Sequence, residues 1–528
     1  MSWVVADRRD WCLPELLQRR GEELGDRPFL SFALGERELS YGEAAQTARR
    51  IAGGLGELGV ARGDRVLMMM RNRAEFTLAM LGVAEAGAVQ VPVNVDYRGP
   101  FLEHLVTASE GSVLIVEDEL LEGVRPSLPA LPSLRTVVVV GGAPDVSFDD
   151  LLRAAAPPAR PRHRSSDIGA IHFTSGTSGR SKGALLPHAA VHMLAERNRQ
   201  LLDIGRDDVY LTELPLFHVN AQMSVYSTLL AGSRLRIERR FSASAWLERI
   251  RAAGATHTSL LGVMLAFILG QPERPDDGDN ALRSAWTVPC PPEPAREFKR
   301  RFGVERVVTS YGSTEIGMVT HHVVGEGPDG AGRVADDLYE VRVVDDEDEE
   351  VPPGEVGQLI VRPRLPWTTT LGYVGMPDAA LTVYRNLWFH TGDAVRIDAD
   401  RNLTFVDRSD DRIRRRGENV PSVDVEVVLA AHPAVAEAAV VAVPAEEQGG
   451  EDEIKAVIVP EPGQALEPED VWAWCDERLP YFAVPRYVEL ATELPKTPTS
   501  KVRKNELRAA GVGGAADRGT ATRGGGLR

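Results

Sequence analysis

A run of small, hydroxyl-bearing and basic residues about a third of the way along the chain suits phosphate binding. The run is TSGTSGRSKG, residues 174–183, and it follows the short apolar run AIHF. Glycines and small hydroxyls allow backbone N–H groups to approach phosphate oxygens, and Lys182 adds a mobile positive charge. Ser181 and Gly183 differ from the P-loop pattern GxxxxGK[ST], which disfavours a P-loop NTPase. The residues predicted to contact phosphate are Thr174, Ser175, Gly176, Thr177, Ser178, Gly179 and Lys182.

Further short segments carry side chains that suit nucleotide chemistry. YGSTE ends in Thr314 and Glu315, a hydroxyl and a carboxylate suited to phosphate and a divalent cation. Asp393 follows a glycine in HTGD, where a carboxylate can accept two hydrogen bonds from a ribose diol. Arg408 offers a planar fork of donors, and Lys501 in LPKTPTSK offers a charge. Taken alone, each is more often an ordinary turn, cap or solvated residue.

The phosphate run lies in a chain that alternates helix and strand patterns. From about Tyr41 to Val93, an amphipathic helical stretch, an apolar strand-like run, a second helix and a short strand follow one another, and the alternation returns in VLIVED, TVVVVG and THTSLLG. This predicts an α/β architecture with parallel strands and helices on both sheet faces. It also disfavours a flexible Gly/Ser linker at residues 174–183, since linkers rarely lie between a strand and an amphipathic helix.

The pattern changes toward the C-terminus. Short β runs separated by acidic or glycine-containing turns predict a β-rich subdomain at about 335–409, within an N-terminal domain of residues 1–409. A basic stretch followed by helix and strand patterns predicts a compact α+β domain over residues 410–508. Residues 509–528, rich in Gly, Ala, Thr and Arg, lack apolar periodicity and are predicted to be disordered.

The composition narrows the classes of function. With 43% hydrophobic and 26% charged residues among 528, the chain resembles soluble multidomain proteins. No apolar run approaches the roughly 20 residues that span a bilayer, and no secretory signal is visible, so a cytoplasmic protein is predicted. A net charge of −17 disfavours a nucleic-acid partner. Cys12, Cys290 and Cys475 form no CxxC pair, which argues against a disulfide framework or a structural zinc site.

Six segments together resemble the motifs of the adenylate-forming (AMP-binding) superfamily, which includes acyl-CoA synthetases, peptide-synthetase adenylation domains and luciferases. TSGTSGRSKG is similar to the signature loop of that superfamily. The other five, in matching order and spacing, are PLFHVNAQ (215–222), SYGSTEIG (310–317), WFHTGD (388–393), DRSDDRIRRRGEN (407–419) and LPKTPTSK (494–501). The resemblance covers roughly residues 25–508 and leans toward the carnitine- or crotonobetaine-CoA ligase branch.

The resemblance implies roles for particular residues. The counterpart of Lys501 contacts the α-phosphate and the acid as the transition state develops, so Lys501 is the expected catalytic residue. Thr314 and Glu315 are expected near the α-phosphate, and magnesium is expected at Glu315 and Thr177. The remaining nucleotide contacts implied by the resemblance are Tyr311, Gly312, Asp393 and Arg408.

The resemblance also implies a moving C-terminal domain and an acid pocket. Asp410 matches the hinge position between two half-reactions, and Gly417, Glu418 and Asn419 would line a tunnel for the pantetheine arm of CoA. The acid pocket is expected to include His218, Asn220, Gln222 and Thr287. The chain departs from the usual pattern in two places. Ser500 replaces the glycine before the catalytic lysine, and the run WTVPCPP from Trp286 replaces a Gly-Gly-Ala-Pro turn, which predicts a smaller or differently shaped pocket.

The function predicted from these residues is ATP-dependent activation of a small carboxylic acid as acyl-AMP with release of pyrophosphate, followed by transfer to CoA. ATP, Mg²⁺ and CoA as co-substrate are implied, and a homodimer stays open. Three alternatives stay open too: a carrier-protein thiol as acceptor, a diazotase that activates nitrite for reaction with an aromatic amine in secondary metabolism, and a non-catalytic AMP-binding module. Retention of Lys182, Glu315, Asp393, Arg408 and Lys501 argues against the last.

Overall fold

A computed structural model gives the fold of the chain. It describes residues 3–33, 37–142, 146–157, 159–174, 181–290, 292–408, 412–416, 418–445, 451–495 and 502–519, without the side chains of residues 407, 408, 412, 419 and 505. Several predicted site residues lie outside this description. They are Ser175, Gly176, Thr177, Ser178, Gly179, Asp410, Gly417 and Lys501, together with the side chains of Arg408 and Asn419.

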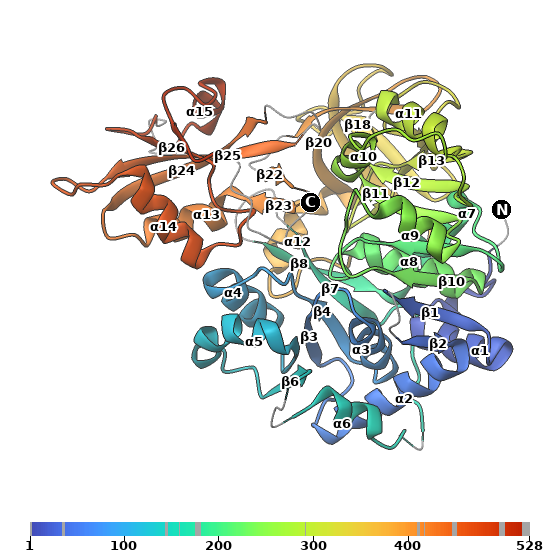
Figure 1. Ribbon diagram of the computed structural model, residues 1–528. Helices are drawn as coiled ribbons and strands as arrows, with labels where there is room; N and C mark the ends of the chain where they lie inside the picture. Colours follow the sequence, from blue (N-terminus) through green and yellow to red (C-terminus); the bar gives the residue numbers. More distant parts are fainter. Residues whose placement is uncertain are drawn as a thin grey trace.

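A six-stranded sheet forms the lower part of the molecule in Figure 1. Its strands, in spatial order, are β6 (Thr136–Val140), β5 (Val113–Glu117), β3 (Arg65–Met69), β4 (Val89–Pro92), β7 (Ile168–Thr174) and β8 (Lys182–Pro187). All adjacent pairs are parallel except the β7–β8 pair. The helices of this region are α2 (Tyr41–Glu57), α3 (Ala74–Glu85), α4 (Gly99–Ser109), α5 (Asp118–Val124) and α6 (Phe148–Arg153).

Alternate residues of β3 enter different hydrophobic clusters, which shows that both faces of this sheet are covered. Val66 and Met68 pack with residues of α2 and α3, whereas Leu67 and Met69 pack with residues of α4. Side chains of a strand alternate between the two faces of its sheet, so a strand buried on both sides is apolar at every position. This explains the continuous apolar run RVLMMM in the sequence.

A thirteen-stranded sheet forms the rest of the large domain, and its central strands are parallel. Its order is β18 (Tyr339–Val344), β19 (Gly357–Pro363), β20 (Phe389–Ile397), β21 (Asn402–Arg408), β17 (Gly332–Val334), β16 (Thr320–Val323), β13 (Arg306–Thr309), β12 (Ser284–Val288), β11 (His257–Leu261), β9 (Val209–Thr212), β10 (Arg234–Ile237), β1 (Pro28–Phe32) and β2 (Glu38–Ser40). The predicted β-rich region therefore contains β18 to β21, hydrogen-bonded in antiparallel register into the same sheet.

Helix α7 (His188–Leu202) packs against strands of both large sheets and against α8 (Val219–Ala231). The Leu202 carbonyl at the end of α7 accepts hydrogen bonds from His257 Nε2 (3.0 Å) and Ser284 Oγ (3.0 Å), which belong to the larger sheet. The remaining helices of this domain are α1 (Leu13–Leu24), α9 (Trp246–Ala253), α10 (Gly262–Leu269), α11 (Pro292–Phe302) and α12 (Pro377–Val383).

The small domain follows β21 and lies at the upper left of Figure 1. It begins with the hairpin β22 (Arg412–Arg415) and β23 (Glu418–Pro421). A four-stranded sheet follows, of β24 (Val435–Pro444), β25 (Asp452–Pro460), β26 (Tyr487–Leu490) and β27 (Ala516–Asp517). Its helices are α13 (Ser422–Ala430), α14 (Pro468–Arg478) and α15 (Lys504–Ala509). The expected fold, a large N-terminal α/β domain followed by a small C-terminal domain, is confirmed.

The structure differs from the sequence expectation at the start of the tail. Residues 509–528 were expected to be disordered, yet β27 pairs with β26 within this stretch. Asp517 accepts hydrogen bonds from Arg486, and the Arg518 guanidinium donates to Asp476 at 2.6 Å. Because ion pairs rather than apolar side chains hold this stretch in place, its sequence shows no apolar periodicity from which a strand could be predicted.

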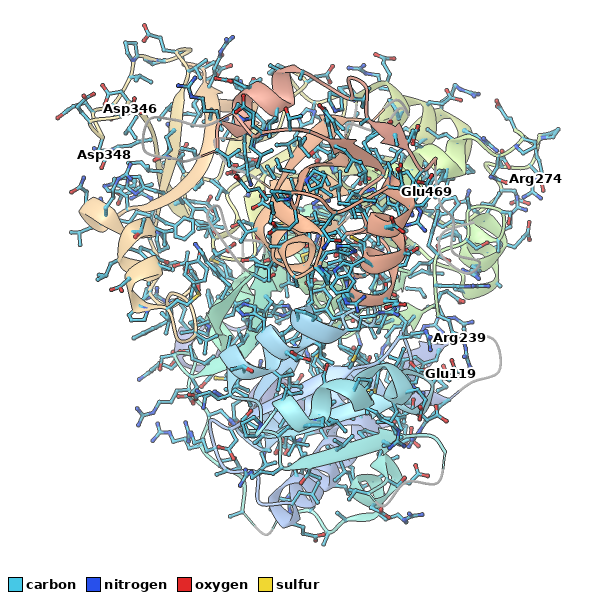
Figure 2. The ribbon with its side chains drawn as sticks, turned by 90° about the vertical axis from the view of Figure 1, so that its left-hand side faces the viewer. Glu119, Arg239, Arg274, Asp346, Asp348 and Glu469 are labelled. Carbon is cyan, nitrogen blue, oxygen red and sulfur yellow. The ribbon has the colours of Figure 1, made fainter. Side chains whose placement is uncertain are left out.

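Charged side chains cover the outer surface, in keeping with the net charge of −17. Glu119, Arg274 and Asp346 are exposed and lie at the rim of the molecule in Figure 2. In the part of the chain that the structure describes, no helix combines the length and the apolar character needed to cross a bilayer.

Candidate active site

The phosphate run joins the last two strands of the six-stranded sheet. Thr174 at the end of β7 is the cross-strand partner of Lys182 at the start of β8, so these two residues of the phosphate run lie side by side in the sheet. Lys182 is 5% exposed, and its Nζ lies 5.4 Å from the centroid of the Tyr373 ring. A lysine ammonium over an aromatic face is stabilised electrostatically, which holds this charge at the start of β8.

Glu315 brings a segment from the other sheet to the same point. It lies in the turn between β14 (Gly312–Ser313) and β15 (Gly317–Met318), next to the half-buried Thr314. Its Oε1 accepts hydrogen bonds from Thr174 Oγ1 (2.7 Å) and from the Tyr373 hydroxyl (3.5 Å). The sequence prediction that these distant motifs form one site is therefore supported by direct contact between them.

This donor set fits a magnesium ion held mainly by nucleotide phosphates. Mg²⁺ prefers oxygen ligands and is often bound through one or two carboxylates together with substrate phosphates. The buried carboxylate of Glu315, with the Thr174 hydroxyl beside it, supplies such ligands. Among the described residues, no group of three or more His, Cys, Asp or Glu side chains forms a separate metal centre.

Asp393 is buried at the edge of the same site. Its Oδ2 accepts a hydrogen bond of 2.5 Å from the Tyr311 hydroxyl, and its backbone N–H donates to Thr391 Oγ1. In the antiparallel register of β20 and β21, Asp393 stands opposite Arg408. The hydrogen bond and the strand pair thus bring together three residues that were predicted to bind the nucleotide: Tyr311, Asp393 and Arg408. Gly312, in the adjacent short hairpin, is exposed.

The predicted acid-pocket residues lie around the start of α8 and at the end of β12. His218 is the residue before the first turn of α8, with the half-buried Asn220 in that turn. Gln222 is fully buried, accepts a hydrogen bond from Gln90 Nε2 (2.9 Å) and donates to the Leu216 carbonyl (3.0 Å). Thr287 on β12 is also fully buried, and its hydroxyl has no hydrogen-bond partner within the described structure.

Sequence reasoning missed His172, which lies two residues before the phosphate run. Its side chain is buried on β7, and burial together with the nearby His218 lowers its pKa to about 4. The imidazole is therefore neutral at physiological pH, and its buried Nε2 has no hydrogen-bond partner in the described part of the chain. The signal was present in the sequence as a lone histidine within the apolar run AIHF.

The small domain contacts the predicted acid-pocket residue His218 through its first hairpin. Glu418 at the start of β23 places Oε1 3.0 Å from His218 Nε2. The hairpin that was predicted to line the tunnel for CoA therefore faces the N-terminal end of α8.

The sequence and the fold both match known proteins. The family model described as AMP-binding enzyme matches residues 17–374, and the model described as AMP-binding enzyme C-terminal domain matches residues 424–501. The crotonobetaine/carnitine–CoA ligase of Salmonella paratyphi A is 30% identical over 507 residues, which cover 92% of this chain and 97% of that protein.

Two structures of o-succinylbenzoate CoA synthetase from Bacillus subtilis, each 24% identical, cover 95% of this chain and 98% of their own. A double mutant bound with its product analogue OSB-NCoA superposes with a TM-score of 0.81, and the complex with AMP superposes with 0.66. The match to both domain models, together with the joined phosphate run, Glu315 and Asp393, shows that the chain belongs to the AMP-binding enzyme family of adenylate-forming, AMP-forming acid–thiol ligases.

Proposed function

We propose that the protein activates a small carboxylic acid with ATP and transfers the acyl group to the thiol of CoA. The observation that carries this proposal is the contact between Glu315 and Thr174, because it joins the phosphate run to the turn expected beside the α-phosphate. The relatives named as CoA ligases support CoA as the acceptor.

In the first half-reaction, a carboxylate oxygen of the acid attacks the α-phosphorus of ATP, and the bond from that phosphorus to the bridging oxygen breaks. Lys182 stabilises the departing diphosphate, and Lys501, which lies outside the described residues, balances the charge that develops at phosphorus. Asp393 and Arg408 hold the ribose. Magnesium, held by Glu315 and Thr177, would supply neutralising charge at the phosphates.

In the second half-reaction, the CoA sulfur attacks the acyl carbon, the bond to AMP breaks and the thiol proton is lost to solvent. We propose that the domain of residues 410–508 rotates about Asp410 against the domain of residues 1–409, withdraws Lys501 and brings Gly417, Glu418 and Asn419 over the acid pocket. The contact of Glu418 with His218 supports this second arrangement. The closer overall match to the relative bound with a CoA product analogue than to the same relative with AMP also supports it.

The proposed acid pocket is formed by the four residues predicted from the sequence, with His172 added, and these side chains favour a small substrate with polar character. They are His172, His218, Asn220, Gln222 and Thr287. The buried Thr287 hydroxyl and the buried Nε2 of the neutral His172 are groups for which a polar substrate could supply hydrogen bonds.

Pyrophosphate release tests the proposal. Purified protein with ATP and magnesium is offered aliphatic and aryl acids, and separately nitrite with amino-arenes, each with and without CoA and with Lys501→Ala as the control. Release that depends on both an acid and Lys501, with formation of a CoA thioester, is the expected result. Pyrophosphate release that requires nitrite would indicate a diazotase rather than an acid ligase. No pyrophosphate release with any substrate would indicate a binding module.

A further inference from the structure

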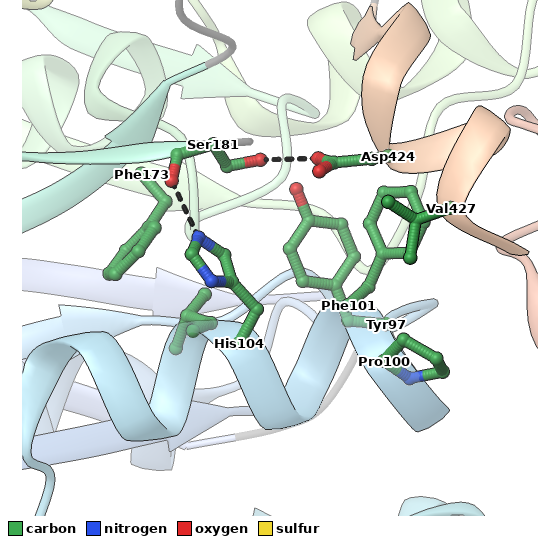
Figure 3. Close-up of a pocket in the computed structure, with 9 residues that line it drawn as sticks. Tyr97, Pro100, Phe101, His104, Phe173, Ser181, Asp424 and Val427 are labelled. Carbon is green, nitrogen blue, oxygen red and sulfur yellow. Dashed lines mark hydrogen bonds between the residues drawn. The ribbon is translucent and has the colours of Figure 1, made fainter. Parts of the chain in front are cut away.

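A small cavity lies where the two domains meet beside the phosphate run. It holds about 10 Å³, roughly the space of one water molecule. Phe101 of α4 belongs to the hydrophobic cluster of the small domain, so the two domains are packed against each other here. Figure 3 shows Ser181 at this cavity, joined by hydrogen bonds to His104 of the large domain and to Asp424 of the small domain.

Ser181 links the two sides of the cavity. Its hydroxyl donates a hydrogen bond of 3.1 Å to Asp424 Oδ2, and its carbonyl oxygen lies 2.8 Å from His104 Nε2, which must donate because a carbonyl only accepts. Ser181 is 6% exposed and Asp424 8% exposed, so the contact between the domains is shielded from water. His104 fixes the end of the phosphate run, and Asp424, in the first turn of α13, fixes the small domain to that end.

The hydrogen bond from Ser181 places the Asp424 carboxylate beside one end of the phosphate run. Ser181 is the residue directly before Lys182, the lysine proposed to stabilise the departing diphosphate. A carboxylate hydrogen-bonded to Ser181 therefore carries negative charge to the end of the site where the diphosphate is proposed to bind. Partial burial raises the pKa of Tyr97 above its usual range, and the charges of Glu418 and Asp424 add to this rise. These charges act in a poorly hydrated environment in which electrostatic repulsion is stronger than in water.

We propose that Asp424 is a positioning residue that holds the small domain in its thioester-forming arrangement only after diphosphate has left Lys182. The inference rests on the proposed function and deepens it. While diphosphate is bound, it repels the Asp424 carboxylate and opposes docking of α13. Once diphosphate leaves, Asp424 accepts the hydrogen bond from Ser181, and the acyl-AMP is exposed to the thiol. The order of the two half-reactions is thereby coupled to product release.

Two variants separate the hydrogen bond from the charge. Asp424→Ala removes both, and the second half-reaction, measured as thioester formation from pre-formed acyl-AMP and CoA, should slow by about tenfold. Adenylation, measured as pyrophosphate release in the first turnover, should stay within about twofold of the unmodified protein, because the proposed contact forms only afterwards. Asp424→Asn keeps an oxygen that accepts from Ser181 and removes the charge, so its thioester formation should stay within about threefold.

The proposed repulsion between diphosphate and Asp424 is tested in the thioester-forming half-reaction. Inorganic diphosphate is added during thioester formation with EDTA present, so that magnesium-dependent reversal to ATP is blocked. It should inhibit the unmodified protein, and Asp424→Asn should require at least about fivefold more diphosphate for the same inhibition. Asp476→Asn is the matched control, because it removes a carboxylate of the same domain whose partner is Arg518 on another face. Its inhibition should match that of the unmodified protein.

Equal inhibition by diphosphate in Asp424→Asn and the unmodified protein would overturn the inference, as would Asp424→Ala slowing both half-reactions equally. Failure of the proposed function is distinguishable, since the unmodified protein would then release no pyrophosphate with any acid.

Discussion

His218 and Glu418 are 200 positions apart in the chain and meet across the domain boundary, with Nε2 of the imidazole 3.0 Å from Oε1 of the carboxylate. The histidine belongs to the predicted acid pocket, and the glutamate to the hairpin predicted to line the path of CoA. Glu418 is mostly buried, whereas the His218 side chain is 41% exposed. A contact that joins these two regions orients the histidine only in this arrangement of the domains.

Replacement of Glu418 should therefore affect the second half-reaction more than the first. In Glu418→Ala, thioester formation from acyl-AMP and CoA is expected to slow by about tenfold, as when one charge-assisted hydrogen bond is lost. Rapid-quench measurements of the two half-reactions separate the effects. Equal slowing of adenylation would show that Glu418 does not act specifically on the arrangement seen here.

Asp393 is expected to control the affinity for ATP. Its carboxylate is buried and accepts a hydrogen bond of 2.5 Å from the Tyr311 hydroxyl, which fixes the orientation of the side chain. Asp393→Ala should raise the KM for ATP by about tenfold or more, since a charged acceptor for the ribose is lost. Tyr311→Phe keeps that acceptor and should have a smaller effect in the same ATP titration. A larger effect of Tyr311→Phe than of Asp393→Ala would contradict this order.

Glu315 is expected to set the requirement for magnesium. Glu315→Gln keeps the size of the side chain and an acceptor for the Thr174 hydroxyl but removes the charge. The adenylation rate should fall by about a hundredfold, and the magnesium concentration for half-maximal rate should rise, because Mg²⁺ favours charged oxygen ligands. Pyrophosphate release across a magnesium series provides the measurement. An unchanged magnesium dependence would exclude Glu315 as a ligand.

Candidate site residues could be named from the sequence where short motifs carried several polar side chains together. Glu315 and Thr174 make direct contact, because Thr174 ends strand β7 and Glu315 lies in the turn of the short hairpin beside it. His172 and Asp424 escaped prediction for a different reason. His172 lies in an ordinary apolar strand pattern and Asp424 in an ordinary amphiphilic helix start, and only long-range packing reveals their neighbours.

The fold was predictable to a similar degree. Alternation of apolar runs and helical patterns predicted the layered large domain, since strands buried on both faces are apolar throughout. Strand β27 was missed because charge pairs, including the one between Arg486 and Asp517, hold it to β26. The continuity of β18 to β21 with the parallel strands also lay beyond local patterns, because sheet order depends on contacts between distant segments.

Three buried histidines and the half-buried His321 predict that the protein loses stability in mild acid. Burial lowers the pKa of His172, His188 and His321 to about 4 and that of His192 to about 3, from an ordinary value of 6.5. Because these folded-state values lie below the unfolded value, the unfolded chain binds more protons between pH 6.5 and pH 4. The free energy of unfolding therefore falls as the pH drops below 6.5, by up to about 1.4 kcal/mol for each unit of pKa shift.

His192 offers the sharpest test of this acid sensitivity. It is 1% exposed, both of its ring nitrogens lack hydrogen-bond partners in the described structure, and its ring stacks on Trp11 with centroids 4.9 Å apart. His192→Phe keeps an aromatic ring in that place and removes the proton-binding group. Melting temperatures measured by calorimetry from pH 7.5 to pH 5 should fall less steeply in this variant than in the unmodified protein. Parallel curves would show that protonation of His192 does not contribute to acid unfolding, whereas a shallower curve would assign part of that unfolding to this one buried ring.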